Sequence, residues 1–236
     1  MTGRRRAIGQ KNEHLFRHTG GFPPPDHDDA DFLLGSAVLL ALARSSAGGS
    51  AGGSWRAIGE KTPENVFLFP RLQRLFPEAR FIGIARDPRD TLTSAWHFFR
   101  GSATSAENED VGKTEFIRNA LPVIVAGMRG MIAMTERDPE HCCSVTYESL
   151  IAAPVPVVSG LLRFLSVSDS EQIVASCLEA TSFARQTGGR PRAEEQRGAF
   201  LRKGVVGDWA TTLTPAMNAT ILDQCGWAFA HFGWRT

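Results

Sequence analysis

Residues 80–94 read RFIGIARDPRDTLTS, and this stretch decides the fold class. The apolar run 80–85 predicts a buried strand. Pro88 suits the first turn of a helix, because proline lacks a backbone N–H and its φ angle is already helical. Arg86 therefore stands at the carboxyl edge of a sheet and beside a helix N-terminus, two places where α/β proteins bind anions. Together with Ser94 on the helix, Arg86 predicts a phosphate site.

The chain from residue 55 onward repeats this alternation of strands and helices. Strands are expected at 55–59, 80–85 and 141–147. Helices are expected at 63–76, 88–100, 114–136, 154–165, 169–180 and 214–232. The stretch 187–199, rich in Gly, Arg and Glu, is expected to be a mobile loop. This alternation favours an α/β fold in which a parallel sheet is flanked by helices.

The first 54 residues are expected to be an irregular segment that ends in a Gly/Ser-rich linker at 45–54. Residues 55–236 then form the folded domain. The apolar run at 33–43 is too short to span a bilayer, and it begins too late for a signal peptide. We interpret this run as a short buried helix, and we expect no transmembrane segment.

The composition is that of an ordinary globular protein. Of 236 residues, 42% are hydrophobic and 22% are charged, which is enough for one sizeable core. The formal net charge of +1 gives no global field that would attract nucleic acid or a membrane, so an anion site must be local. The cysteines are not spaced as metal ligands, and we expect reduced core thiols in a cytoplasmic protein. They are Cys142, Cys143, Cys177 and Cys225.

Two further motifs lie on either side of residues 80–94 in the sequence. Residues 59–66 read GEKTPENV and place Glu60 and Lys61 between a predicted strand and a predicted helix. Residues 200–209 read FLRKGVVGDW, in which an Arg-Lys pair precedes a glycine. Two adjacent cations followed by glycine let both side chains and the backbone N–H groups face one phosphate.

With these motifs the chain resembles the sulfotransferase family, enzymes that move a sulfuryl group from 3′-phosphoadenosine 5′-phosphosulfate (PAPS) to an acceptor. The segment 86–94 is similar to the family's 3′-phosphate motif, and 202–209 is similar to its C-terminal nucleotide motif. Glu-Lys-Thr-Pro at 60–63 is similar to the central motif of bacterial and carbohydrate-type members. Tyr147-Glu-Ser-Leu150 and Thr181-Ser-Phe183 also match in type and order. The resemblance implies the P-loop NTPase-like sulfotransferase fold.

The resemblance also implies a role for individual residues. Those implied for the 3′-phosphate are Arg86, Ser94, Arg202, Lys203 and the N–H of Gly204. Those implied for the adenine pocket are Tyr147, Thr181 and Phe183. Lys61 would lie near the bridging oxygen and offset charge on the departing phosphate. No metal is implied, because arginines and lysines would supply the positive charge.

The acceptor hydroxyl or amine needs a general base. Carbohydrate-type members of the family use the glutamate just before the central lysine, which is Glu60 here. Cytosolic members use a histidine two positions after that lysine, where this chain has Pro63. We therefore favour Glu60 as the base and keep His97, on the predicted helix 88–100, as the alternative.

Simpler structural interpretations stay open for several of these residues. Asp87 could cap the helix that follows it, with Arg89 solvated. Thr181 and Phe183 could be an ordinary helix cap and a core aromatic residue. Trp209 is expected to pack the loop that holds the Arg-Lys pair.

The family's opening strand and its Gly/Ser/Thr-rich loop, which cradles the 5′-phosphosulfate, have no recognisable counterpart in residues 1–58. The expected sheet then lacks its first strand and loop. Two functions stay open: a sulfotransferase that acts on a hydroxyl or amine of a small molecule, sugar or lipid, and a relative that binds the 3′-phosphoadenosine nucleotide without turnover. A nucleotide kinase ranks last, because its phosphate-binding loop is not found. The dimer motif of cytosolic members is not matched at 210–219, which leaves the oligomeric state open.

Overall fold

The computed structural model describes residues 34–38, 41, 59–100, 109–196 and 199–236. The chain divides into two compact units, Met1–Ala79 and Arg80–Thr236. The predicted linker and the predicted boundary at residue 54 lie outside the described residues. The predicted strand at 55–59 does so as well, apart from Gly59, which is not in a strand.

The first unit contains the helix α3, Asn65–Leu75, which the sequence predicts at 63–76. It carries Pro70 in its interior and buries Phe69. The helix ends at Phe76, whose backbone has φ −136° and ψ 72°. Pro77 follows, and the residue before a proline is biased away from helical backbone, which explains why the helix ends there.

The apolar run at 33–43 is helical at its described residues, 34–38 and 41. Leu34 and Val38 are exposed, so the expectation of a buried helix is wrong for these side chains. The close contact is made instead by Gly35, where an added Cβ would lie 3.0 Å from the carbonyl oxygen of Leu75. A glycine lets the two backbones approach.

The second unit is built on two parallel strands, β1 at Phe81–Ala85 and β2 at Cys142–Thr146. They pair in register from Phe81 opposite Cys142 to Ala85 opposite Thr146. Both strands were predicted from their apolar runs. The expectation that the first strand is buried holds for one face only, because Ile84 is 60% exposed and neighbouring side chains of a strand point to opposite faces.

The two strands are joined through α4, Pro88–Arg100, and α5, Glu109–Arg137. The bounds of α4 are those that the sequence predicts, whereas α5 begins five residues before the predicted start at residue 114. Glu109 and Asp110 lie in the first turn of α5, where negative charge is favourable next to the helix dipole. By length and composition α5 could cross a membrane, a test that the core helix of a soluble protein also passes. The absence of a transmembrane segment therefore stays a prediction.

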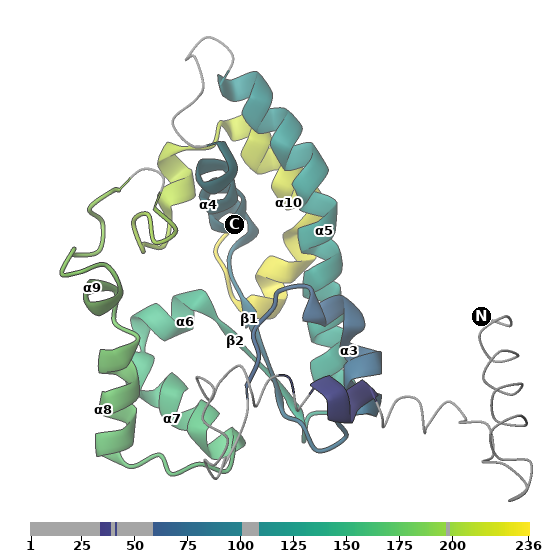
Figure 1. The fold of residues 1–236 in the computed structure, drawn as a ribbon. Helices are drawn as coiled ribbons and strands as arrows, with labels where there is room; N and C mark the ends of the chain where they lie inside the picture. The colour runs from purple at the N-terminus through teal and green to yellow at the C-terminus, as the bar shows by residue number, and fades with distance from the viewer. Residues whose placement is uncertain (1–33, 39–40, 42–58, 101–108, 197–198) are drawn as a thin grey trace, which may run out of the picture. The chain divides into compact units, whose positions relative to one another are not determined.

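The remaining helices follow β2. They are α6 at Tyr147–Ala152, α7 at Pro154–Phe164, α8 at Glu171–Ala180, α9 at Phe183–Gln186, the 3₁₀ turn η2 at Asp208–Thr211 and α10 at Pro215–Phe232. In Figure 1, α4, α5 and α10 gather on one side of the two strands, and α6, α7 and α8 gather on the other. This arrangement is the predicted parallel sheet flanked by helices.

The core of the second unit lies where α4, α5 and α10 meet. Its fully buried side chains include Leu92, Leu121, Ile221 and Phe229. The four cysteines are free thiols, and Cys142 and Cys225 are buried. Burial raises the pKa of the Cys142 thiol to about 11, so this thiol stays protonated at neutral pH.

Candidate nucleotide-binding site

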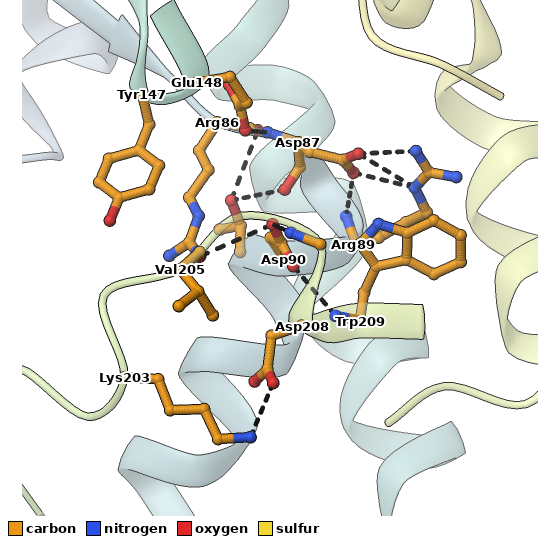
Figure 2. A network of polar contacts seen from close by, with 12 residues as sticks. Arg86, Asp87, Arg89, Asp90, Tyr147, Glu148, Lys203, Val205, Asp208 and Trp209 are labelled. Atoms are coloured by element: carbon orange, nitrogen blue, oxygen red, sulfur yellow. Dashed lines mark hydrogen bonds and ion pairs between the residues drawn. The ribbon is translucent and has the colours of Figure 1, made fainter. Parts of the chain in front are cut away.

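Arg86 lies at the turn between β1 and α4, where three distant segments of the chain meet (Figure 2). Its Nη2 atom donates a hydrogen bond of 2.9 Å to the carbonyl of Val205, 119 residues further along the chain. The same atom lies 3.7 Å from a carboxylate oxygen of Asp90. The guanidinium carbon lies 4.5 Å from the centre of the Tyr147 ring, at the start of α6. The structure thus brings Arg86 to the C-terminal motif, which the sequence places far away.

Asp90, in the first turn of α4, holds that motif from the other side. Its side chain accepts hydrogen bonds from the backbone N–H of Gly207 at 2.7 Å and of Trp209 at 3.0 Å. The residue is 1% exposed. Burial raises the pKa of this carboxyl, while the two backbone hydrogen bonds and the charge of Arg86 act against the rise. The turn before α4 and the first turn of that helix therefore contact the 202–209 segment through a cation, Arg86, and an anion, Asp90.

Arg89 and Asp87 form a buried ion pair with an N–O distance of 2.7 Å. The Arg89 guanidinium lies 3.8 Å from the Trp209 ring centre and 4.6 Å from that of Phe229. Asp87 also accepts from the Arg89 backbone N–H at 2.9 Å, which is the expected helix cap. The idea that Arg89 is solvated is wrong, because the aromatic side chains of η2 and α10 cover it and leave it 2% exposed.

Glu148 ties this turn to β2 and to the end of the chain. One of its carboxylate oxygens accepts from the backbone N–H of Asp87 at 3.0 Å, and the other accepts from Nε1 of Trp234 at 2.9 Å. Glu148 belongs to the Tyr-Glu-x-Leu motif, whose glutamate the sequence left without a role. The contacts give it one, which is to fix the backbone of the Arg86 turn.

The Arg-Lys pair of the C-terminal motif is surrounded by carboxylates. Arg202 pairs with Asp208, and also with Glu195 at 2.8 Å, while Lys203 pairs with Asp208 at 2.8 Å. Burial alone would raise the pKa of Asp208, but the hydrogen bonds from Lys203 and Arg202 outweigh it and hold the pKa below its usual range. These ion pairs fix both cations against the carboxylates of Asp208 and Glu195.

Gly204 follows the pair with a φ of +67°, in the region that favours glycine. An added Cβ at this position would lie 2.6 Å from ring carbons of Phe183, which is too close for any side chain. Phe183, at the start of α9, is buried. Glycine is therefore needed here so that the backbone can lie against the aromatic ring.

Two arginines that the sequence did not single out lie among the predicted adenine residues. Arg192 donates to the Gly204 carbonyl at 2.6 Å and to the Tyr147 hydroxyl at 3.4 Å. Its guanidinium carbon is 5.2 Å from the Phe183 ring centre. Arg190 donates to the Arg202 carbonyl at 2.6 Å. The loop expected to be mobile at 187–199 is thus attached to the C-terminal motif at its described residues. Its arginines were the sequence feature that could have indicated these contacts.

Thr181 is the C-cap of α8, and its hydroxyl donates to the Cys177 carbonyl at 2.7 Å. The simpler interpretation of this residue as a helix cap therefore describes its contacts. Its predicted role at adenine stays a prediction, because the hydroxyl is exposed and oxygen can still accept a hydrogen bond.

Ser94 and His97 lie further along α4, and both are half-buried. Ser94 follows Asp90 by four residues, which places both on one face of the helix. Burial and the charge of Arg202 lower the pKa of His97, while Glu195 and Asp208 act in the opposite direction. His97 is therefore neutral at pH 7 and lies within the electrostatic reach of the Arg-Lys pair.

Glu60 and Lys61 belong to the first unit and are both exposed. The Glu60 carboxylate accepts hydrogen bonds from Oγ1 of Thr62 and Nδ2 of Asn65. These contacts hold the carboxylate at the N-terminus of α3. Of the predicted site residues, those for the nucleotide all lie in the second unit, and the two predicted catalytic residues lie in the first.

Four guanidinium nitrogens in the described part of the second unit are buried without a hydrogen-bond partner: Nη1 of Arg89, Nε of Arg190 and one nitrogen in each of two predicted phosphate-binding residues. Nε of Arg86 and Nε of Arg202 are buried, and neither has a hydrogen-bond partner in the described part of the chain. Buried donors are nearly always paired. An anion that reaches both arginines would satisfy these donors, so the residues present fit a phosphate group. Within the described ranges, no three His, Cys, Asp or Glu side chains form a group that could hold a metal ion.

Residues 6–171 match the model of a family described as the sulfotransferase family. This match covers well over half of the chain, and the chain belongs to that family. Cytosolic sulfotransferase 16 of Arabidopsis thaliana is 27% identical over 168 residues, which cover 60% of this chain and 48% of the relative. Human sulfotransferase 2B1 is 30% identical over 157 residues, covering 60% and 42%. The chain thus spans about half the length of the curated relatives it matches.

Two solved structures are similar in fold. Mouse sulfotransferase SULT7A1 complexed with PAP has a TM-score of 0.52 and 20% identity, and the similarity covers 64% of this chain and 58% of that one. Retinol dehydratase in complex with androsterone and the inactive cofactor PAP has a TM-score of 0.54 and 14% identity, covering 89% and 65%. These likenesses confirm the predicted α/β sulfotransferase fold.

Proposed function

We propose that this chain binds a 3′-phosphoadenosine nucleotide and acts as a sulfotransferase with PAPS as the donor. The observation that carries the proposal is the meeting of Arg86 with the 202–209 segment through the Val205 carbonyl, at 2.9 Å. Each segment alone is a weak signal of phosphate binding. Their contact across 119 residues is what a single clamp around one doubly charged group requires.

The proposed clamp consists of Arg86, Ser94, Arg202, Lys203 and the N–H of Gly204. The unpaired Nε donors of Arg86 and Arg202 support it, because they leave buried hydrogen-bonding capacity on both segments. Tyr147 and Phe183, with Thr181, would hold the adenine base by stacking and hydrogen bonding. The guanidinium carbons of Arg190 and Arg192 lie 4.9 and 5.2 Å from the centre of the Phe183 ring, so adenine would take the place of one of these groups.

The proposed chemistry is the transfer of a sulfuryl group to a hydroxyl or amine. The acceptor oxygen or nitrogen forms a bond to sulfur, the bond from sulfur to the bridging oxygen breaks, and the acceptor's proton passes to a base. Glu60 is the proposed base, and the hydrogen bonds from Thr62 and Asn65 would orient its carboxylate. Lys61 would offset charge on the departing phosphate. His97, which is neutral at pH 7, is the alternative base.

Positive charge in this proposal comes from arginine and lysine side chains, so we propose no metal cofactor. The acceptor would be a small molecule, sugar or lipid, and nucleic acid is not a proposed partner. The similarity to proteins named cytosolic sulfotransferases supports a cytoplasmic location.

The test is isothermal titration with adenosine 3′,5′-bisphosphate, using wild type and the Arg86→Ala variant. We expect binding by wild type and a loss of about 2–5 kcal/mol in the variant, the cost of removing one partner of a buried charge pair. Arg185→Ala is the matched control, because Arg185 forms an exposed ion pair with Glu179 on the surface. Equal affinities of wild type and Arg86→Ala would disprove the clamp.

The second candidate is a relative that binds the nucleotide without turnover. It is favoured by the sequence of residues 1–58, in which no Gly/Ser/Thr-rich phosphosulfate loop is recognisable. Incubation with labelled PAPS and a broad panel of acceptors separates the two candidates. Labelled product supports the enzyme, whereas tight binding of the bisphosphate with no product for any acceptor supports the relative.

A further inference from the structure

The carboxylate of Asp90 joins the two halves of the proposed clamp, although the resemblance gives this residue no role. Each of its oxygens has a different backbone partner. Oδ2 accepts from the N–H of Gly207, and Oδ1 accepts from the N–H of Trp209. Oδ2 also faces Arg86 at 3.7 Å. One side chain thus contacts the cation of the first motif and the backbone of the second (Figure 2).

The contacts of Asp90 decide where the 202–209 segment runs. Arg86 holds its middle at Val205, and Asp90 holds its end at Gly207 and Trp209. Arg86 lies in the turn just before α4 and Asp90 lies in the first turn of that helix, so the start of one element sets both attachments. Loss of the second attachment would leave the Val205 hydrogen bond as the direct contact between Arg86 and this segment in the described part of the chain.

Asp90 is suited neither to bind the phosphate directly nor to act only through its negative charge. A carboxylate repels phosphate, and this one is enclosed by its own partners with 1% of its surface exposed. Burying a carboxylate is costly unless hydrogen bonds compensate. Two charge-assisted bonds to N–H groups provide that compensation, and both go to the segment that carries Arg202 and Lys203.

We propose that Asp90 is a positioning residue, which sets the spacing between Arg86 and the Arg202–Lys203 pair and thereby creates the preference for a 3′-phosphate. This inference rests on the proposed nucleotide-binding function. It predicts that Asp90 affects discrimination between nucleotides with and without the 3′-phosphate, rather than nucleotide binding in general.

The test compares wild type with Asp90→Asn in titrations with adenosine 3′,5′-bisphosphate and with adenosine 5′-monophosphate. An amide has only one oxygen, so it can satisfy only one of the two N–H groups that now bind different oxygens. The released segment then shifts away from the phosphate, and the loss of one hydrogen bond to a charged group corresponds to about a ten- to hundredfold loss in affinity, which we expect for the bisphosphate. The affinity for the monophosphate should stay within about twofold, because that nucleotide does not use the clamp.

Asp223→Asn on the exposed part of α10 is the matched control and should leave both affinities unchanged. Equal losses for the two nucleotides would show a merely structural role and overturn the inference. Tighter binding of the bisphosphate by Asp90→Asn would also overturn it, because that is the result if Asp90 acts only by repelling the anion. If wild type binds neither nucleotide, the proposed function itself is wrong.

A second measurement does not depend on the folding of the variant. Hydrogen exchange of the Gly207 and Trp209 amides in wild type should slow when the bisphosphate is added, since a filled clamp holds the segment against Asp90. The monophosphate should not slow it. Unchanged exchange of both amides with saturating bisphosphate would contradict the positioning role, even if Asp90→Asn failed to fold.

Discussion

Arg89 shows that the first turn of α4 depends on a single buried charge. Its guanidinium pairs with Asp87 and lies between the rings of Trp209 and Phe229. The sequence is compatible with either a solvated or a buried Arg89, because a helix that begins with proline can have either kind of side chain at its next position. Only the neighbouring aromatic side chains, one from η2 and one from α10, decide that Arg89 is buried.

Substitution of Arg89 by alanine should lower the free energy of unfolding by about 3–5 kcal/mol, because Asp87 would be left buried without its partner. Urea denaturation followed by circular dichroism measures this loss. Arg185→Ala removes an ion pair whose side chains are 62% and 76% exposed, and such pairs contribute about 0–1 kcal/mol. Similar effects of the two substitutions would contradict the structural role assigned to Arg89.

His97 is a second residue whose behaviour follows from its surroundings. Burial and Arg202 lower its pKa below the usual value of 6.5. The folded state thus favours the neutral ring, so the stability that His97 contributes is present above pH 6.5 and is lost as the pH falls through the lowered pKa. NMR titration of the ring protons should give a midpoint below 6.5 in the free protein.

Addition of adenosine 3′,5′-bisphosphate should raise the pKa of His97, because a phosphate beside Arg202 offsets the positive charge that lowers it. Adenosine 5′-monophosphate should have a smaller effect and serves as the control. A midpoint that stays the same at saturating bisphosphate would mean that the phosphate does not bind near Arg202.

At the scale of elements, the packing of α5 on β1 depends on a glycine. A Cβ added at Gly83 would lie 2.4 Å from Sδ of Met131. Gly83→Val should therefore lower the free energy of unfolding by about 1–3 kcal/mol through overpacking. Urea denaturation tests this, and pairing the substitution with Met131→Ala should cost less than the sum of the two single changes, because the alanine frees space.

Gly160→Ala in α7 is the control for this experiment, since no atom lies within 4 Å of its added Cβ. We expect it to be neutral or to stabilise by up to about 1 kcal/mol through helix propensity. If Gly83→Val lowered the free energy of unfolding no more than Gly160→Ala, the close packing of α5 on β1 would be contradicted.

The elements also show which local signals the sequence contains. The start of α4 at Pro88 was predicted, because Pro and the preceding apolar run fix it locally. The short helices α6 and α9 were not predicted. Their starts depend on the single side chains Thr146 and Ser182, which accept from the N–H groups of Ser149 and Arg185. A helix of four to six residues has no hydrophobic period that could reveal it.

At the scale of the whole molecule, the proposed clamp couples ligand binding to the stability of the unit Arg80–Thr236. A bisphosphate at 100 times its dissociation constant should add about 2.7 kcal/mol to the free energy of unfolding of this unit. For a protein of this size that corresponds to a rise in Tm of about 2–4 °C per kcal/mol. Differential scanning calorimetry with and without the nucleotide measures the rise.

The same experiment with Arg86→Ala should show at most about a third of that rise, because a loss of about 2–5 kcal/mol weakens binding at least about 30-fold. Since the chain has two compact units, the shift should appear in the transition of the second unit and leave any separate transition of the first unit in place. An equal rise in the variant would contradict a clamp that includes Arg86.

The sequence by itself determined the local parts of this protein: the strand before Arg86, the helix that begins at Pro88, the Arg-Lys-Gly segment and, from their order, the family. These features depend on neighbouring residues, so they leave a readable pattern. Only the tertiary structure decided that Val205 meets Arg86 and that Asp90 holds Gly207 and Trp209. Contacts between residues more than 100 positions apart depend on how the helices and strands pack, and no local pattern of residues encodes that packing.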